Sequence, residues 1–199
     1  MISYSGIQQH TITDFQKYLA IPGYSFSFLK REQNGESPEF ILTDKIELGK
    51  LVDDILTRGH RDYAHRLYPI AQDIAMFING KWPQVIQSCD KQVAYTGTAE
   101  MNGFTMDVKG ILDFLFPGFF VLDLKVTAAK LKDIPALIQY MGYDNQLWNY
   151  GKLANVNKAY LLFYSTTSKC CCVHGFRIGS RNEFWEGKIL KFGRVGEGV

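Results

Sequence analysis

Two aspartates and a lysine interrupt an otherwise apolar stretch in the middle of the chain. Asp113, Asp123 and Lys125 are surrounded by runs such as Phe-Leu-Phe and Phe-Phe-Val-Leu. Burying a charged side chain is costly unless it is paired or binds a metal, so their placement needs a chemical reason. Carboxylate oxygens are the ligands that Mg²⁺ prefers, and a neighbouring lysine can orient a water or offset charge on a phosphate. The stretch therefore predicts metal-assisted hydrolysis of a phosphodiester.

The spacing of these three residues is that of a β-hairpin. With a three-residue Pro-Gly-Phe loop at 117–119, Asp113 lies directly opposite Asp123, with their Cβ atoms about 4.5–5.5 Å apart. Lys125 follows Asp123 by two positions and falls on the same face of its strand. Carboxylates this close repel each other unless a cation or a proton lies between them. The alternative is a surface hairpin with both aspartates in solvent and Lys125 paired to one of them, and a wider turn would shift the register by one residue.

The same residues resemble a known family. Gly110-Ile-Leu-Asp113, followed ten positions later by Asp123-Leu-Lys125, is similar to the metal-binding core of PD-(D/E)xK nucleases. The most similar branch is that of the RecB-like and RecE-like exonucleases, which include the phage lambda exonuclease type. The resemblance implies an α/β (α+β) fold with a restriction-endonuclease-like core, a central mixed β-sheet flanked by helices. It also implies that Asp113, Asp123 and the backbone carbonyl of Leu124 hold Mg²⁺ (or Mn²⁺), while Lys125 positions the attacking water.

A glutamine and a tyrosine downstream extend the resemblance. Gln146-Leu-Trp-Asn-Tyr150 is similar to the Q-x-x-x-Y motif of the RecB-like branch. Residues four apart share one face of a helix, so both side chains can reach the same site. Such a pair also occurs by chance at helical spacing, and its value comes from its place after the D…DxK pattern. In the family this pair supports the catalytic lysine and the DNA backbone, so the resemblance places Gln146 and Tyr150 among the catalytic residues.

A glycine and an aspartate upstream resemble the first helical motif of the family. Gly49-Lys-Leu-Val-Asp53 matches a pattern in which a Gly is followed four residues later by a metal-binding residue. The family has His at that position, and this chain has Asp53, which is also a good Mg²⁺ ligand. Gly49 lies one turn earlier on the same side of the expected helix and leaves room for a metal or DNA. Asp53 is accordingly either a third ligand or a solvated aspartate at the helix edge.

Periodicity along the chain predicts the elements that must position these residues. Asp44 with Glu47 is typical of a helix N-terminal cap, and apolar residues then recur at helical spacing. Residues 1–42 are broken by Pro and Gly and are expected to form an N-terminal extension of short elements, packed on the core of a single domain, 1–199. Further helices are predicted at about 60–68, 69–79, 133–141, 143–155 and 181–192, and strands at 92–97, 104–115, 119–127, 158–165 and 170–177.

Composition fits a folded protein without a large excess of charge. The 199 residues are 46% hydrophobic and 21% charged, with 22 Lys+Arg against 20 Asp+Glu, a formal charge of +2. Such a small charge predicts modest, strongly metal-dependent affinity for DNA, so that a processive enzyme would need a ring or a partner protein. No apolar run approaches the roughly 18–20 residues needed to span a bilayer, and the N-terminal stretch does not read as a secretory signal. We expect no membrane partner and a cytoplasmic protein, and the resemblance implies that it is bacterial or phage-encoded.

The cysteines and histidines do not form a metal-binding pattern in the sequence. Cys170, Cys171 and Cys172 are consecutive, and on a strand the middle one points away from its neighbours. They therefore cannot converge with Cys89 on one iron–sulfur cluster, and we expect none. A basic segment around His60 and His65 could contact phosphates, although a solvated helix face is the commoner explanation.

Together these patterns predict a Mg²⁺-dependent DNA nuclease, more exonuclease than endonuclease, acting in phage or bacterial recombination and repair. A homo-oligomer or a recombination and repair protein is the expected protein partner, since relatives form rings or act within larger machines. Two alternatives stay open. One is a structure-specific endonuclease on the same core, and the other is a DNA-binding or assembly subunit that has lost turnover, which the Asp at the usual His position permits.

Overall fold

The computed structural model describes residues 1–10, 15–35 and 43–195. Its centre is a mixed β-sheet in which six strands follow one another in space in the order of the chain. A short seventh strand pairs with the third. The strands are β1 (Ser3–His10), β2 (Asp90–Met101), β3 (Phe104–Phe116), β4 (Phe120–Thr127), β5 (Lys158–Ser165), β6 (Cys170–Arg177) and β7 (Arg194–Val195).

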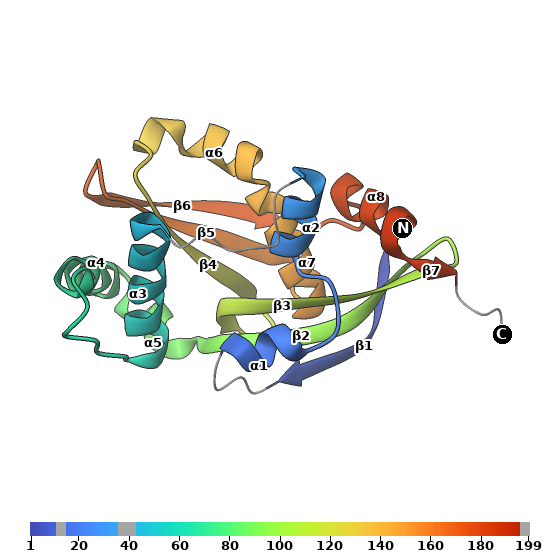
Figure 1. Cartoon of the computed structure of the whole chain (residues 1–199), viewed down its shortest axis with the longest axis horizontal. Helices are drawn as coiled ribbons and strands as arrows, with labels where there is room; N and C mark the ends of the chain where they lie inside the picture. The colour runs from blue at the N-terminus through green and yellow to red at the C-terminus, as the bar shows by residue number, and fades with distance from the viewer. Residues whose placement is uncertain (11–14, 36–42, 196–199) are drawn as a thin grey trace.

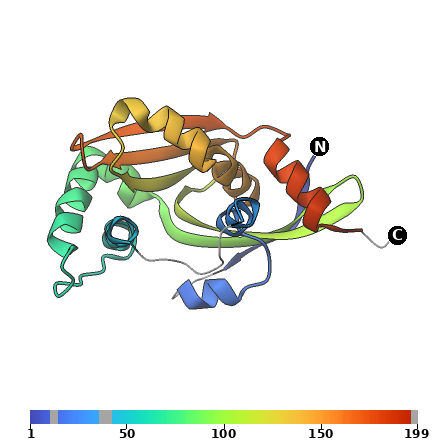
Figure 2. The ribbon, with the colours of Figure 1, turned by 45° about the horizontal axis from the view of Figure 1, so that its top comes forward.

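Helices cover both faces of this sheet (Figures 1 and 2). Those of the described ranges are α1 (Phe15–Ala20), α2 (Phe26–Gln33), α3 (Asp44–Arg58), α4 (Tyr68–Lys81), α5 (Pro83–Ser88), η1 (Leu131–Asp133), α6 (Ile134–Met141), α7 (Tyr143–Leu153) and α8 (Glu183–Phe192). One core packs α3, α4 and α5 against β3–β5, and a second packs α6 and α7 against the same strands from the other side. A third lies where α2 and α8 meet β2 and β3. The predicted mixed sheet flanked by helices is confirmed.

One parallel pair of strands determines where α7 lies on the sheet. β4 and β5 run parallel, whereas the other neighbouring strands are antiparallel. Parallel neighbours need a crossover, and here η1, α6 and α7 provide it across one face. This crossover brings α7 back over β3, β4 and β5.

The β3–β4 hairpin has the register that its loop predicts. β3 ends at Phe116, β4 begins at Phe120, and the N–H of Phe119 donates to the carbonyl of Phe116 across the loop. Gly118 takes the left-handed conformation (φ 76°) that closes so short a loop. The ladder then runs from Phe116↔Phe120 to Phe114↔Leu122 and ends there. It stops one pair before Asp113 would face Asp123, so the two aspartates stand where the strands part.

The N-terminal region contributes a strand to the sheet. β1 pairs with β2 along its length, with an irregularity between Ser5 and Gln8. Tyr24 is joined to Val108 of β3 by an isolated bridge, and Ser25 caps α2 by accepting from the N–H of Phe28. The sequence predicted only short elements packed on the core here, because the alternation in β1 is weak and most of its residues are exposed. Part of the 1–42 extension lies outside the described residues.

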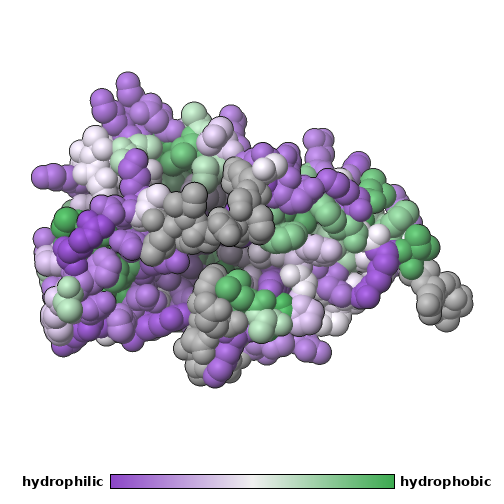
Figure 3. All heavy atoms as spheres, in the orientation of Figure 1, coloured by the Kyte–Doolittle hydropathy of each residue, from purple (hydrophilic) through white to green (hydrophobic). Residues whose placement is uncertain are grey.

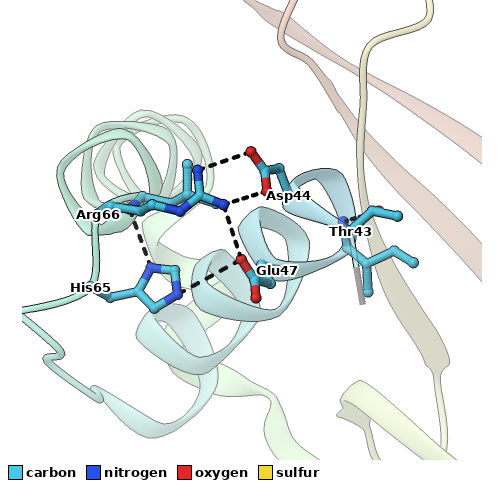
Figure 4. Close-up of polar contacts among 7 residues, drawn as sticks. Thr43, Asp44, Glu47, His65 and Arg66 are labelled. Atoms are coloured by element: carbon cyan, nitrogen blue, oxygen red, sulfur yellow. Dashed lines mark hydrogen bonds and ion pairs between the residues drawn. The ribbon is translucent and has the colours of Figure 1, made fainter. Parts of the chain in front are cut away.

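The helix predicted at 60–68 is wrong. The chain runs through turns between the end of α3 at Arg58 and the start of α4 at Tyr68. Gly59 ends α3 in the left-handed conformation, and side chains then hold the connection. Arg66 makes a two-pronged contact with Asp44 and also approaches Glu47 at 3.6 Å (Figure 4). These contacts fasten the connection to α3, while the N–H groups of His65 and Tyr68 donate to the carbonyls of Asp62 and His65 in turns instead of a helix.

Other element boundaries differ from the predictions by small amounts. The N-cap of α3 is Thr43, whose hydroxyl accepts from the N–H of Ile46 at 3.4 Å, so Asp44 and Glu47 lie in the first turn instead. There they still favour the helix, because carboxylates oppose the positive end of its dipole. The short helix α5 was not predicted, and α8 begins at Glu183 after an Asn182 cap.

On the face drawn in Figure 3, the polarity of the surface varies from one end to the other. In Figure 3 hydrophilic residues predominate around α3 and α4, whereas hydrophobic residues gather at the end formed by α8 and β7. Leu190 and Val195 are exposed there. No helix within the described ranges is both long and apolar enough to cross a bilayer.

Candidate active site

The candidate site lies where β3 and β4 separate. Asp113 Oδ2 accepts a hydrogen bond of 2.8 Å from the backbone N–H of Leu124. Because β3 no longer pairs with β4 at this point, the Asp113 carboxylate satisfies a β4 donor that the ladder leaves free. The side chain of Asp113 thus bridges the two strands at their fork.

Asp123 and Lys125 occupy the β4 side of the same fork. Their side chains form an ion pair, and Asp123 is almost fully buried at 2% exposure. The Lys125 ammonium also lies 5.0 Å from the centre of the Tyr143 ring, at the start of α7. The ring gives the cation a favourable electrostatic contact on a second side. The pairing confirms that Asp123 and Lys125 share a face of the strand.

Asp53 reaches the site from α3 on the opposite layer. Its Oδ2 accepts a 2.6 Å hydrogen bond from Nε2 of Gln92, a residue of β2. Its Oδ1 is buried and has no hydrogen-bond partner. A buried carboxylate oxygen without a donor is costly. Asp53 is therefore not a solvated aspartate at the helix edge.

Burial and neighbouring carboxylates raise the pKa of Asp53. Burial, followed by the charges of Asp54 and Asp123, raises the pKa of Asp53 to about 7, with Arg58 and Lys125 acting in the opposite direction. Proton binding at so high a pH is what desolvated carboxylates show when they lie close to one another.

The carboxylate cluster raises the pKa of both Asp113 and Lys125, which favours the neutral form of the aspartate and the charged form of the lysine. Burial raises the pKa of Asp113 well above its ordinary value, and the charges of Asp53 and Asp123 raise it further. Burial alone would lower the pKa of Lys125, but the charges of Asp123 and Asp113 outweigh it and keep the ammonium protonated. The site therefore holds one permanent cation among three carboxyl groups.

Gln146 and Tyr150 form a pair on the buried face of α7. The Gln146 amide donates to the Tyr150 hydroxyl at 2.8 Å, as their four-residue spacing predicts. Burial and the charge of Asp123 are the largest causes that raise the pKa of Tyr150 well above its ordinary value. The ring packs on Gly110, where an added Cβ would lie only 2.7 Å from a ring carbon. The glycine of the Gly-Ile-Leu-Asp motif thus makes room for this tyrosine.

Three further residues of the site were missed by the sequence analysis. Gln92 holds Asp53, Tyr143 lies beside Lys125, and Tyr18 is close enough to influence the pKa of Tyr150. Tyr18 is held in place by Lys109, whose ammonium lies 4.9 Å from the Tyr18 ring centre. None of the three belongs to a local motif. In the sequence, the charged Lys109 inside an apolar strand was the one signal that a contact with another segment, here the one carrying Tyr18, could be expected.

Lys109 fastens the N-terminal segment to the sheet. Its ammonium donates to the carbonyls of Tyr18, Leu19 and Ile21, at 3.3, 3.2 and 2.6 Å. These carbonyls lie at the end of α1, where helix carbonyls lack partners and favour a cation. The residue is buried, so its role is structural, and it places Tyr18 next to α7.

The donor set of the site suits a hard divalent cation. Asp53, Asp113 and Asp123 supply carboxylate oxygens, and the unpartnered Oδ1 of Asp53 is the kind of group that such an ion would satisfy. Among the described residues, however, no three acidic, His or Cys side chains are already arranged as ligands of one ion. One oxygen of Asp123 is engaged by Lys125 and one of Asp53 by Gln92. The residues fit a metal in kind, and the three carboxyl groups would have to come together around one ion to bind it.

The consecutive cysteines alternate across the sheet, as a strand predicts. Cys171 packs against the core beneath α3–α5, and Cys172 packs against the one beneath α6 and α7. All four cysteines are free thiols, and burial is the largest cause that raises the pKa of Cys89 and of Cys171 to about 11.

Two surface hollows of about 290 and 340 Å³ lie away from the candidate site, because Asp53, Asp113 and Asp123 line neither of them.

Comparison with known proteins identifies the fold. No protein-family model matches the chain, and no curated protein matches its sequence. A solved structure named "putative exonuclease" from Eubacterium rectale has a TM-score of 0.50 and 20% identity, covering 87% of this chain and 71% of that one. SSO0001 matches with a TM-score of 0.45 at 14% identity over 85% and 83% of the chains. A phage related exonuclease from Haemophilus somnus 129PT matches with 0.43 at 14% over 88% and 92%. The first of these proteins shares the overall fold.

Proposed function

We propose that this protein is a metal-dependent DNA nuclease, and that it acts as an exodeoxyribonuclease. The observation that carries the proposal is the gathering of Asp53, Asp113 and Asp123 with Lys125 at the fork of β3 and β4. Burial and neighbouring carboxylates raise the pKa of Asp53 and of Asp113, and Oδ1 of Asp53 is buried without a hydrogen-bond partner, so this group of residues favours a bound cation. Its fold, shared with a protein named as an exonuclease, agrees with this chemistry.

Asp53, Asp113 and Asp123 would hold Mg²⁺ or Mn²⁺, with the Leu124 carbonyl as a further oxygen ligand. When bound, the ion polarises the phosphate and lowers the pKa of a water. The oxygens available to bind the ion are Oδ1 of Asp53, which has no hydrogen-bond partner, and the carboxylate oxygens of Asp113 and Asp123 that are not engaged by Leu124 or Lys125. Mutual repulsion among the carboxylates favours the ion, because its charge removes the cost of keeping all three deprotonated.

Lys125 would position the water and offset charge on the phosphate. Its ammonium remains protonated beside Asp123, so it acts as a hydrogen-bond donor and a fixed positive charge. In the reaction the water oxygen bonds to phosphorus as one phosphorus–oxygen ester bond breaks. The attacking water gives up one proton to the solvent, and the departing sugar oxygen takes up one proton from the solvent. Gln146 and Tyr150 would support Lys125 and the DNA backbone from α7.

The biological setting is part of the proposal. We infer that the substrate is DNA, in phage or bacterial recombination and repair, within the cytoplasm. With a net charge of only +2, the chain would need a ring of its own copies or a recombination or repair partner to stay on DNA through many cycles.

The test compares linear with closed-circular duplex DNA in Mg²⁺ or Mn²⁺. The proposal expects nucleotides to be released from linear DNA while intact circles survive. Lys125→Ala should abolish release, and Lys158→Ala, at an exposed lysine on β5, is the matched control. Cutting of intact circles would instead identify the structure-specific endonuclease. Equal activity in wild type and Lys125→Ala would remove the catalytic assignment, and no activity in either would favour the inactive DNA-binding or assembly subunit.

A further inference from the structure

Gln92 lies at a break in the pairing between β2 and β3. Lys91 pairs with Phe114 and Val93 with Leu112, whereas Gln92 and Asp113, the residues between them, are not paired. Gln92 is also in the left-handed backbone conformation, with φ of 51°. A side chain other than Gly is strained there, so such residues persist only where the surroundings hold them. The strain thus falls directly beside the proposed metal ligand Asp113.

The position of this strain is unusual within the molecule. In the described part of the chain, Asn102, Asn155 and Lys169 are the other residues with positive φ that are not Gly. All three lie in turns, where the left-handed conformation is common. Gln92 alone of the four lies within a strand. A turn does not explain its conformation.

The Gln92 side chain spans from β2 to α3. Its Nε2 donates to Asp53 Oδ2 at 2.6 Å, and its Oε1 lies 3.5 Å from Nη2 of Arg58. The amide nitrogen can only donate and the amide oxygen can only accept. A carboxylate on one side and a guanidinium on the other therefore set the orientation of the amide. Asp53 is left with one oxygen held and the other, the buried Oδ1, without a partner.

We propose that Gln92 is a positioning residue, whose amide holds Asp53 Oδ2 so that Oδ1 is presented to the metal. This inference rests on the proposed function and deepens it, because it says how a third ligand from another layer is aligned with Asp113 and Asp123. The strained backbone is what directs the side chain of a β2 residue towards α3. Groups that orient metal ligands in this way commonly change metal affinity about 10–100-fold when they are removed.

Two substitutions separate the amide from the backbone strain. Gln92→Gly relieves the strained conformation and removes the amide, whereas Gln92→Asn keeps an amide in a residue that tolerates this conformation but is one methylene shorter. Lys169→Gly is the matched control, since it relieves the same strain (φ 51°) in a turn between β5 and β6. Asp113→Asn reports on the metal site itself.

The measurement is Mn²⁺ binding by electron paramagnetic resonance, with the melting temperature of each metal-free variant. We expect Gln92→Gly to melt no lower than wild type and to bind Mn²⁺ at least about 10-fold more weakly. Gln92→Asn should weaken binding similarly, and Lys169→Gly should bind as wild type does. Wild-type affinity in both Gln92 variants, with binding lost in Asp113→Asn, would overturn the positioning role and leave the proposed function standing. Absence of Mn²⁺ binding in wild type, or equal binding in Asp113→Asn, would overturn both.

Discussion

The two ends of α3 carry carboxylates in opposite circumstances. At its N-terminus Asp44 is exposed and contacts Arg66, which holds the pKa of Asp44 below its usual value (Figure 4). About two and a half turns later, in the C-terminal half of α3, Asp53 lies near Asp113 and Asp123, and burial raises its pKa to about 7. On one helix, the ionised form of an aspartate is therefore stabilised at position 44 and destabilised at position 53.

The difference shows what each region is built for. Asp44, Glu47 and Arg66 satisfy one another, so this exposed network fastens the 59–67 connection to α3 and has no use for a further cation. At the other end the buried Lys125 lies among three carboxyl groups, and Arg58 is a further cation that lowers the pKa of Asp53 without offsetting its burial. Unbalanced, desolvated charge marks a site where chemistry can occur, whereas balanced exposed charge marks a structural contact.

The largest difference between the ends should appear in activity. Asp123→Asn removes a negative charge from the buried cluster and should lower the rate of nucleotide release on the order of 10³-fold, about 4 kcal/mol of transition-state stabilisation. Asp44→Asn should leave that rate unchanged. The measurement is release from linear duplex DNA in Mg²⁺, with circular dichroism to confirm that both variants fold. Equal effects of the two substitutions would abolish the distinction between the two ends.

The two ends should also respond oppositely to pH in the metal-free protein. Between the ordinary Asp value of 3.8 and about 7, folded Asp53 keeps a proton that the unfolded chain has released. The free energy of unfolding should therefore fall as pH rises through this window, with Asp53 accounting for roughly 2–4 kcal/mol. Asp53→Asn should lose that share of the slope in urea titrations from pH 4 to pH 8.

For Asp44 the sign is reversed. Its lowered pKa contributes stability that is present above the ordinary Asp value and is lost as pH falls through the folded-state value. Asp44→Asn should therefore lower stability by a small, nearly constant amount from about pH 4 to pH 8, and its difference from wild type should disappear only in more acidic solution. A wild-type profile between pH 4 and pH 7 that matches that of Asp53→Asn would contradict the raised pKa at the buried end.

Packing at the buried end should matter by a smaller amount. The Cβ of Gly110→Ala would lie 2.7 and 2.8 Å from two carbons of the Tyr150 ring, so the ring must move. We expect a loss of about 1–3 kcal/mol in the free energy of unfolding. Gly49→Ala, on α3 between its two ends, is the control, because nothing lies within 4 Å of the added Cβ. That variant should gain up to about 1 kcal/mol. A Gly110→Ala protein as stable as wild type would show that Tyr150 is not held there.

The smallest effect is expected at the exposed end. Arg66→Ala removes contacts whose partners are open to solvent, so the melting temperature should change by only about 2 °C, and less in high salt. Nuclease activity should be unaffected. A large loss of stability that persists in high salt would show that Arg66 does more than fasten the connection to α3.

Short-range features of the site were predictable from the sequence. The three-residue loop at 117–119 determines the register of β3 and β4, because a hairpin of given loop length allows few pairings. The four-residue spacing of Gln146 and Tyr150 determines their hydrogen bond, since both lie on one helix face. The alternation of Cys170–Cys172 follows likewise from the period of a strand. In each case the covalent chain itself brings the residues together.

Long-range contacts were decided by the tertiary structure alone. Gln92 and Asp53 are 39 positions apart and meet because α3 packs over the end of β2. Tyr18 lies close enough to Tyr150 to raise its pKa, on a segment that Lys109 fastens to the sheet by binding the carbonyls of Tyr18, Leu19 and Ile21. The helix wrongly predicted at 60–68 fails for the same reason, since Arg66 finds its partner in α3. Periodicity constrains neighbours along the chain, whereas the packing of layers, which no local pattern records, decides which distant residues share a site.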